Sequence, residues 1–483
     1  MYRYGKVSVV GVTEDHLSLT TATAKISHML GTAEEVLESC QAMEKEEQIK
    51  TIHRIPHPSV TEHCYINMMF NDVSMFVEQY IIEHRLAAYS IKSRRYVNFG
   101  DAGWNMPDFS YLGDENKIAM AEKALENLFK TSFMCYKDMI DSGIPKEDAR
   151  YVLPYGFKSN FFASMDADNF AELIVDMVAG EGSKYPEIKF YGESLKTFYE
   201  ENINYIDINK KIENFNGERN LDIYKTIFDR YEQGPEERTL TTIMSHTKWP
   251  QDIFVREALR SEGYDVHPWT TDTYVCTPEE FELLVKDVIG KKRQRALEQI
   301  NFRVRINKIS LATYTHVTRH RMQGLNPPNL LNAVYYDRYI TPPSIKESEF
   351  IDDFNDIFIF AAETWMALEA LGIKKEDRIY TLICGNTISV TTSINAEELL
   401  HMCKLRCCNR AQWEVRNIFN SILRSARIIS DPLFKYFGPS CFVTGKCPEG
   451  KMSCGKMEEM KEFYGLEEKE FNKRILEMVS ETK

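Results

Sequence analysis

The chain has 483 residues, which is long for one compact core and favours two domains. Hydrophobic residues make up 43% of it and charged residues 27%, a composition typical of globular domains and not of disordered or fibrous proteins. The formal net charge of −13 argues against broad electrostatic binding of nucleic acid or of an anionic membrane. Glu14 and Asp15 interrupt the apolar stretch near the N-terminus, so we expect neither a signal peptide nor a membrane span.

The cysteines indicate a reducing environment. There are eleven, an odd number, and several of them, such as Cys64 and Cys135, lie in apolar or helical contexts without the regular spacing of a disulfide framework. Thiols persist in the cytoplasm, so we expect a cytoplasmic protein.

The first segment with a strong chemical signature runs from His57 to Val97, HPSVTEHCYINMMFNDVSMFVEQYIIEHRLAAYSIKSRRYV. Its pattern predicts a strand at Tyr65–Phe70 and then a helical run at Val77–Arg85. The mixture of arginine, serine and histidine is typical of an anion-binding surface, because guanidinium groups form paired hydrogen bonds with phosphate oxygens. A metal site is the less favoured alternative, since His57 and His63 are six residues apart and no HExxH helix is present.

The next segment has a counterpart much later in the chain. MCYKDMIDSGIPKEDARYVLP (Met134–Pro154) is similar to ETWMALEALGIKKEDRIYTLI (Glu363–Ile383): each has an amphipathic helix, a Gly-Ile turn, Lys-Glu-Asp, and then Arg150 or Arg378. A run ending in His-Arg precedes each segment, with 66 residues from His84 to Arg150 and 58 from His320 to Arg378. A strand-like run and a helical run follow each segment, the helical runs being Met165–Val178 and Ile394–Arg406.

Four signals in the same order predict a tandem duplication. The alternative is a chance likeness between two amphipathic helical regions. We place repeat 1 at 1–215, a linker at 216–240 and repeat 2 at 241–440, because NFNGERN and EQGPEER carry the Gly, Pro and charge content of a linker. Strands such as Phe302–Ile306 among several helices predict an α+β fold, with a small sheet and a bundle of helices in each repeat.

A cysteine-containing tail, 441–483, completes the chain. Cys441, Cys447 and Cys454, together with Cys407 or Cys408, could form a zinc or iron–sulfur site, but the spacing lacks CxxC. We favour a structural or redox-silent role and expect no metal. The run from Met457 to Val479 predicts an exposed amphipathic helix, either solvated or at an interface.

The motifs HxSxxEH, His-Arg and SxRYV of repeat 1 resemble those of the flavin-dependent thymidylate synthases, whose signature is RHRxxSxNExSxRY. Repeat 1 keeps five residues of that signature, and DARYVLP, with Arg150 and Pro154, is similar to the family's next block. The five are His84, Arg85, Ser93, Arg95 and Tyr96. It departs from the pattern at Glu83, Ala88, Ser90 and Ile91, and it has Asp168 and Met177 where the family has arginines.

Repeat 2 departs from the same pattern at other positions. It keeps the RHR triplet, Arg319–Arg321, and the segment Ile394–Arg416 is similar to the family's C-terminal block. The two positions of SxR are Asn329 and Leu331, and Pro327 replaces the signature glutamate.

The resemblance implies a homotetramer in which each nucleotide site is shared between subunits. One half of that site survives in repeat 2, as Arg319 and Arg406, with His316 in place of a glutamine. The other half survives in repeat 1, as Ser93, Arg95 and Arg150. We therefore expect one composite site from complementary halves of the two repeats, in a homodimer that forms a pseudo-tetramer.

The resemblance also implies roles for individual residues. Arg406 would lie beside the uracil ring, where a fixed cation stabilises negative charge as C5 becomes nucleophilic. The other residues would lie around FAD, although a structural role is equally open for each: His57, Ser59, Glu62, His84, Arg85, His320, Arg321, Asn395 and His401.

The implied activity is FAD-dependent one-carbon transfer to C5 of a uracil nucleotide, most simply dUMP to dTMP, with methylenetetrahydrofolate and NADPH as co-substrates. Two other functions stay open. The first is a pyrimidine-nucleotide hydroxymethylase or another altered substrate, because Glu397 reverses a charge of the family's NAR triplet and Ile91 and Pro327 remove the signature carboxylate. The second is a catalytically silent nucleotide-binding or scaffold protein.

Overall fold

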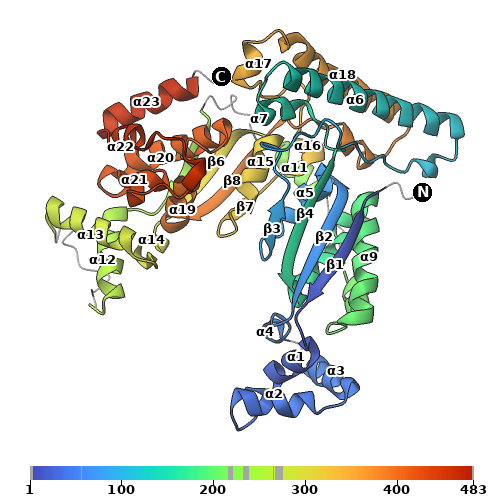
Figure 1. Cartoon of the computed structure of the whole chain (residues 1–483), viewed down its shortest axis with the longest axis horizontal. Helices are drawn as coiled ribbons and strands as arrows, with labels where there is room; N and C mark the ends of the chain where they lie inside the picture. Colours follow the sequence, from blue (N-terminus) through green and yellow to red (C-terminus); the bar gives the residue numbers. More distant parts are fainter. Residues whose placement is uncertain are drawn as a thin grey trace. The chain divides into compact units, whose positions relative to one another are not determined.

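The computed structural model describes residues 4–55, 57–215, 221–231, 239–264, 266 and 276–480 (Figure 1). Contacts divide the chain into two compact units. Unit 1 comprises Met1–Gly234 and Glu347–Cys384, and unit 2 comprises Pro235–Lys346 and Gly385–Lys483. Each unit has a four-stranded sheet and several helices, which confirms the predicted α+β fold of two tandem repeats. Two parts of the expected linker 216–240, residues 216–220 and 232–238, lie outside the described residues.

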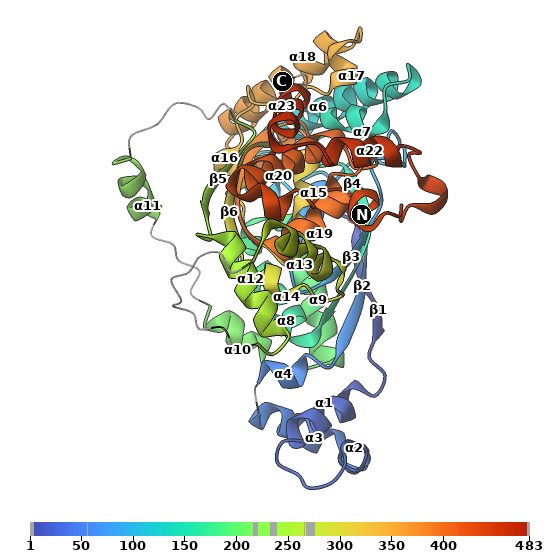
Figure 2. The same cartoon turned by 90° about the vertical axis from the view of Figure 1, so that its left-hand side faces the viewer.

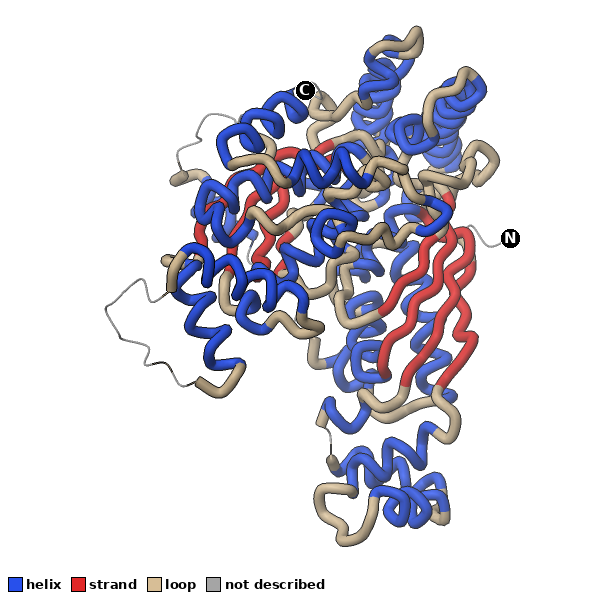
Figure 3. Tube along the Cα trace, turned by 60° about the vertical axis from the view of Figure 1, so that its left-hand side comes forward, coloured by secondary structure: helices blue, strands red, loops and turns tan. Residues whose placement is uncertain are grey.

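The sheet of unit 1 has the order β1-β2-β4-β3, with every pair antiparallel. Its strands are β1 (Lys6–Val12), β2 (Tyr65–Ser74), β3 (Ala88–Ile91) and β4 (Lys158–Asp166). Along β2, the buried side chains of Ile66, Met68 and Phe70 alternate with exposed ones, so one face of the sheet lines the core. Helices α8 (Ala167–Val178) and α9 (Pro186–Asn202) pack against the sheet and against each other (Figures 2 and 3).

Unit 2 repeats this sheet strand by strand, in the order β5-β6-β8-β7. The strands are β5 (Thr241–His246), β6 (Asn301–Ser310), β7 (Gly324–Asn326) and β8 (Thr387–Asn395). Asn301 is opposite Asn395, as Tyr65 is opposite Asp166 in unit 1. The register shifts at equivalent places, between Phe70 and Val73 and between Ile306 and Ile309, so the repeats share one strand geometry down to its irregularity.

This register corrects one equivalence drawn from the sequence. Lys158 and Thr387 begin equivalent strands, and counting back from them without a gap aligns Arg150 with Ile379 and not with Arg378. The same alignment matches Gly143 with Gly372, which have φ of 93° and 86°. Repeat 2 therefore lacks the arginine of this block.

Equivalent segments of the two repeats pair with each other inside unit 1. The amide of Tyr155 donates to the carbonyl of Leu382 at 2.7 Å, and the amide of Cys384 donates to the carbonyl of Leu153 at 2.9 Å. Tyr155 and Cys384 occupy equivalent positions, as do Leu153 and Leu382. The pairing is thus a local pseudo-two-fold contact.

The equivalent long helices take part in the same contact. α6 (Glu115–Asp141) packs along α18 (Ile351–Ala370), and both belong to unit 1, although α18 lies within repeat 2 of the sequence (Figure 1). Buried Leu128 on α6 and Phe358 on α18 are among the apolar side chains of these two helices. The sequence repeats are contiguous, whereas the compact units are interleaved.

The helices that carry the His-Arg pairs end before those residues. α5 (Met75–Ile82) and α15 (Leu311–Thr318) begin at serine caps, Ser74 and Ser310, whose hydroxyls accept from the third helical amide. The sequence predicted helical runs through Arg85 and Arg321, but the last helical residues are Ile82 and Thr318, so these pairs lie just beyond the helix ends.

The expected single exposed helix at Met457–Val479 was wrong. The structure has two helices there, α22 (Met457–Tyr464) and α23 (Glu468–Ser480), separated by a break at Gly465. Tyr464, Phe471 and Ile475 are buried, and α23 packs against α20 (Trp413–Phe434). The apolar face that the sequence pattern predicted therefore packs against α20 of the same chain.

The other helices lie around these elements and in the connections between them. In the described residues no helix is long and apolar enough to cross a membrane. Their bounds are α1 (His16–Lys25), α2 (Ala33–Gln41), α3 (Lys45–Arg54), α4 (Pro58–Thr61), α7 (Lys146–Ala149), α10 (Ile208–Glu213), α11 (Leu221–Phe228), α12 (Pro250–Ser261), α13 (Pro278–Gly290), α14 (Arg295–Glu298), α16 (Leu330–Ala333), α17 (Pro343–Lys346), α19 (Ala396–Arg406) and α21 (Ser440–Thr444), with short 3-10 turns η1 (Ser110–Leu112), η2 (Arg150–Val152), η3 (Glu181–Lys184), η4 (Asp377–Thr381) and η5 (Gly450–Met452).

Candidate functional site

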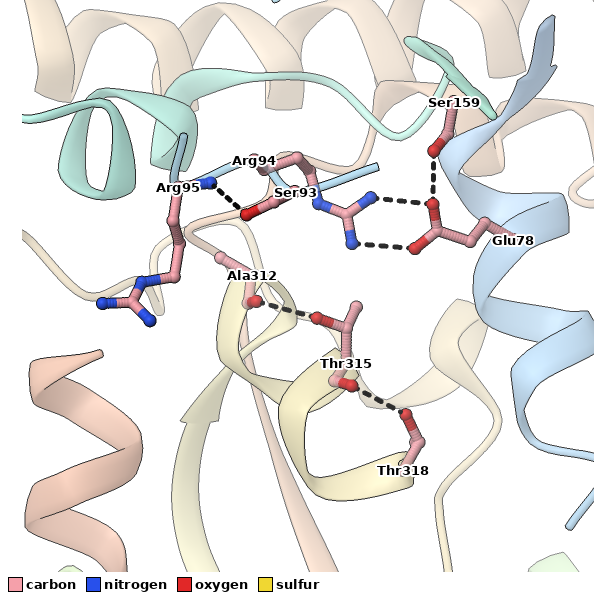
Figure 4. Close-up of polar contacts among 8 residues, drawn as sticks. All are labelled: Glu78, Ser93, Arg94, Arg95, Ser159, Ala312, Thr315 and Thr318. Atoms are coloured by element: carbon pink, nitrogen blue, oxygen red, sulfur yellow. Dashed lines mark hydrogen bonds and ion pairs between the residues drawn. The ribbon is translucent and has the colours of Figure 1, made fainter. Parts of the chain in front are cut away.

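A buried ion pair anchors the Ser93–Arg95 segment in unit 1. The two terminal nitrogens of Arg94 donate to the two carboxylate oxygens of Glu78, each at 2.8 Å, and the hydroxyl of Ser159 donates to the same carboxylate (Figure 4). Glu78 is 0% exposed and Arg94 is 6% exposed. Because Arg94 points into the core, its neighbour Arg95 points away from this pair, as Figure 4 shows.

One residue, Glu147, contacts both arginines predicted to bind phosphate. Arg95 donates from Nε to the Glu147 carboxylate at 2.6 Å, and Arg150 donates from Nε to the Glu147 backbone carbonyl at 3.1 Å. Ser93 accepts from the Arg95 amide at 3.3 Å, which fixes the turn between them. Ser93, Arg95 and Arg150 therefore lie close together around Glu147, and their role as phosphate ligands stays a prediction.

This site favours an anion. Burial lowers the pKa of Arg150, which is 2% exposed, because a charged guanidinium is poorly solvated there. A negative charge beside it would offset that cost.

Unit 2 has a different polar cluster around His320. Arg406 donates from Nε to Nε2 of His320 at 2.8 Å and from a terminal nitrogen to the carbonyl of His316 at 3.2 Å. Nδ1 of His320 lies 3.4 Å from a carboxylate oxygen of Glu398. Burial, together with the charges of Arg406 and His401, lowers the pKa of His320 to about 2, so the imidazole is neutral.

The helix that leads to this cluster satisfies its own hydroxyl groups. Thr315 donates to the carbonyl of Ala312 and Thr318 donates to the carbonyl of Thr315, each at 3.2 Å (Figure 4). These bonds follow the i to i−3 pattern of serine and threonine within helices. We therefore assign a structural role to Thr315 and Thr318.

The residues expected around FAD fall into local groups in their own units. In unit 1, Nδ1 of His57 and the hydroxyl of Ser59 lie 2.6 Å apart at the start of α4, and Glu62 follows that helix, all three exposed. Nε2 of His84 lies 3.7 Å from Asp176, and Arg85 next to it is exposed.

In unit 2 the corresponding groups lie at the start of α19 and beyond α15. The side-chain oxygen of Asn395 accepts from the amide of Glu398 at 2.8 Å and so caps α19. His401 is exposed, with its ring centroid 5.9 Å from that of His320. Arg319 and Arg321 are exposed on either side of buried His320.

Four cysteines of unit 2 line one small cavity of about 30 Å³: Cys408, Cys441, Cys447 and Cys454. Cys407 does not line it; its carbonyl accepts from the hydroxyl of buried Tyr464 at 3.1 Å. Within the described parts of the chain, no group of three or more histidine, cysteine, aspartate or glutamate side chains is placed to hold a metal ion.

Comparisons with known proteins agree with both repeats. The family model described as "Thymidylate synthase complementing protein" matches residues 8–199 and 242–429. The chain belongs to this family. A flavin-dependent thymidylate synthase of Geobacter sulfurreducens is 32% identical over 188 residues, covering 37% of this chain and 78% of that protein. One of Clostridium tetani is 33% identical over 190 residues, covering 35% of this chain and 74% of the relative.

A solved structure, the UMP/dUMP methylase PolB of Streptomyces cacaoi bound with 5-Br dUMP, is also similar. The match covers 41% of this chain and 90% of that one, at 20% identity and a TM-score of 0.34. An overlap this low supports neither the fold nor the activity, so membership of the family depends on the sequence matches alone.

Three charged residues of the site were missed from the sequence: Glu78, Glu147 and Glu398. The doublet Arg94-Arg95 was a usable signal, because a second arginine beside a predicted ligand is a candidate for an internal ion pair, and a buried arginine needs an acidic partner. For Glu398 the available signal was its position three residues after the cap Asn395.

Proposed function

We propose that this member of the flavin-dependent thymidylate synthases transfers a one-carbon unit reductively to C5 of a uracil nucleotide, most simply converting dUMP to dTMP. FAD would be the cofactor, with methylenetetrahydrofolate and NADPH as co-substrates. Family membership and the two local clusters around Arg95 and Arg406 support this proposal.

The observation that carries the proposal is the complementary loss of site residues. At the three positions that repeat 1 keeps, repeat 2 has uncharged side chains: Ser93, Arg95 and Arg150 correspond to Asn329, Leu331 and Ile379. Repeat 2 keeps Arg319 and Arg406, where repeat 1 has Glu83 and Met177, and it has His316 in place of the family's glutamine, where repeat 1 has Tyr80. We infer one composite site from the two halves, because independent decay does not predict such a pairing.

The chain's own residues would divide the chemistry between them. Arg95 and Arg150, held by Glu147, would bind the dianionic phosphate of the nucleotide, and Ser93 would add a neutral donor. Arg406 would stabilise negative charge on the uracil ring as C5 becomes nucleophilic. Bound FAD would supply hydride transfer and carry the one-carbon unit.

The donor set fits a flavin dinucleotide. Its pyrophosphate needs cations, which exposed Arg85 and Arg321 offer, and the imidazoles of His57 and His401 are exposed as well. These residues would hold FAD. Glu397 is the exception: it is half-buried beside Glu398, and burial raises the pKa of its carboxyl.

Two measurements test the proposed activity. Purified protein should show flavin absorbance, and it should release tritium from C5-labelled dUMP only when methylenetetrahydrofolate is present. A protein that takes up no FAD would contradict the proposal and favour the silent scaffold.

Matched variants test the composite site. Arg95→Ala and Arg406→Ala should each lower dUMP affinity by about 100-fold, a typical loss for a charge-assisted contact. Leu331→Ala and Met177→Ala, at the equivalent positions of the other repeat, should leave the affinity unchanged. Equal sensitivity of all four positions would rule out the pairing of halves.

A hydroxymethylase or another altered substrate is the second candidate, favoured by Glu397 near the expected flavin. It predicts tritium release from a different pyrimidine nucleotide, such as dCMP, and none from dUMP. A homodimer acting as a pseudo-tetramer and a cytoplasmic location complete the proposal; light scattering would measure the first and fractionation the second.

A further inference from the structure

Arg406 is held by a chain of polar contacts that occurs in repeat 2 alone. Its Nε donates to Nε2 of His320 at 2.8 Å, and Nδ1 of His320 faces Glu398 at 3.4 Å. The side chains of His320 and Glu398 are 3% and 4% exposed, so both contacts are shielded from water. In repeat 1 the positions of Arg406 and Glu398 are Met177 and Asn169. The arginine and the glutamate are therefore lost or kept together.

The contact fixes the tautomer of His320. A guanidinium nitrogen can only donate, so Nε2 of His320 must be the unprotonated, accepting nitrogen. The ring proton is then on Nδ1, which faces a carboxylate oxygen of Glu398 at 3.4 Å. A doubly protonated imidazole would place an N–H against the Nε–H of Arg406 and repel it.

His320 is neutral because burial and its cationic neighbours outweigh the one acidic group that faces it. Arg406 and His401 are the cationic or titratable groups beside its ring, Glu398 is the acidic one, and the ring of Phe419 lies 6.1 Å away between centroids. Burial is the largest cause that lowers its pKa to about 2.

We propose that Glu398 and His320 are positioning residues for the proposed site. Glu398 orients the neutral ring of His320, and Nε2 of His320 fixes the guanidinium of Arg406 against the uracil ring. This inference depends on the proposed function for the role of Arg406. The contacts from Glu398 to His320 to Arg406, called the relay below, do not depend on it. The carbonyl of His316 holds a second nitrogen of Arg406 at 3.2 Å, so the plane of the guanidinium is set by two acceptors.

The first test is a double-mutant cycle in the FAD-loaded full chain, with dUMP affinity and turnover as readouts. His320→Leu should weaken dUMP binding by about 10- to 100-fold, because a hydrogen bond to a charged group is lost. His320→Gln should recover most of the loss, since its amide oxygen can accept from Arg406. In the Arg406→Ala background, His320→Leu should cost less than about twofold, as expected for residues that act as one unit.

Arg95→Ala provides the matched cycle. His320→Leu should cost the same factor in that background as in the wild type, because Arg95 belongs to the other half of the proposed site and the Arg95→Ala variant keeps Arg406 and His320 unchanged. A general structural defect would lower affinity equally in both backgrounds and would overturn the proposal. Flavin absorbance of each variant separates a loss of Arg406 positioning from a loss of FAD. The variant His246→Gln, at an exposed strand end, controls for the loss of a histidine.

The second test needs no substrate. In ¹⁵N-histidine spectra, the His320 signal, assigned with His320→Gln, should show a protonated Nδ1 and an unprotonated Nε2 that do not change between about pH 5 and 8. Titration near the ordinary histidine pKa of about 6.5, or a proton on Nε2, would contradict the relay. If the spectra agree but the wild type binds no dUMP, the proposed function fails and the relay stands.

Discussion

At the scale of residues, Glu147 is the feature that joins the predicted phosphate ligands. It holds Nε of Arg95 with its carboxylate and Nε of Arg150 with its carbonyl. Glu147 therefore holds the two guanidinium groups close to each other, and guanidinium groups suit bidentate binding of phosphate oxygens.

The Glu78–Arg94 pair gives a stability prediction. Arg94→Met should lower the free energy of unfolding by about 3–5 kcal/mol, because it leaves the carboxylate of fully buried Glu78 without its cation. The double variant Glu78→Leu with Arg94→Met should recover most of this loss. Urea denaturation measures both, and an unchanged midpoint for the single variant would show that the pair carries no such cost.

At the scale of elements, equivalent turns share a backbone conformation that favours glycine. Gly143 follows α6 and Gly372 follows α18, with φ of 93° and 86°. Alanine at either position should destabilise the protein by about 1 kcal/mol or more, through conformation alone, since no neighbouring atom would clash with the added methyl group. Gly290→Ala, where φ is ordinary and the space is open, is the control. Thermal unfolding that shifts equally for all three variants would contradict this account.

The turn η4 that follows Gly372 contains an acid that prefers to be protonated. Burial raises the pKa of Asp377 from 3.8 to about 6. Its folded pKa is above its unfolded value, so its stabilising contribution is present below about pH 4 and is lost as the pH rises through 6. Asp377→Asn should therefore raise the unfolding free energy at pH 7.5 by about 2–3 kcal/mol.

The same substitution should bring little gain near pH 3, where the wild-type carboxyl is mostly protonated in both states. Denaturant midpoints at the two pH values measure the difference. A gain of equal size at both would show that the ionisation of Asp377 is not its cause.

The elements were largely predictable and their partners were not. Alternation at Tyr65–Phe70 and Phe302–Ile306 identified β2 and β6, because one face of each strand must be buried. The amphipathic pattern of 457–479 showed an apolar face but not that α20 covers it, and the break at Gly465 went unnoticed. Glu78 meets Arg94 only because β3 and its following turn bring the chain back, which no local pattern reveals.

At the scale of the whole molecule, the two repeats together keep one set of the predicted nucleotide-binding residues, whereas two complete repeats would carry two sets. The motifs indicated which half of the site each repeat kept. Finding the residue of repeat 2 that is equivalent to Arg150 required the register of β4 and β8. Sequence alone could not establish this alignment, because Arg378 is one residue away from the correct position and has the same chemistry.

The complementary halves predict the stoichiometry of binding. FAD-loaded protein should bind one dUMP per chain, since two chains would share two working sites and the other two would lack arginines. Equilibrium dialysis with labelled dUMP gives the number directly. Two nucleotides per chain would mean that each repeat has a complete site, and none would exclude the proposed substrate.

The interleaving of α18 with unit 1 has a consequence for synthesis on the ribosome. Unit 1 needs the segment Glu347–Cys384, which is made after the whole first part of unit 2, Pro235–Lys346. At about 5–20 residues per second, roughly 10–30 s separate Gly234 from Cys384. During that time α6 lacks α18, one of the elements it packs against, so nascent protein in this window should be the form most dependent on chaperones and most prone to pair with another copy.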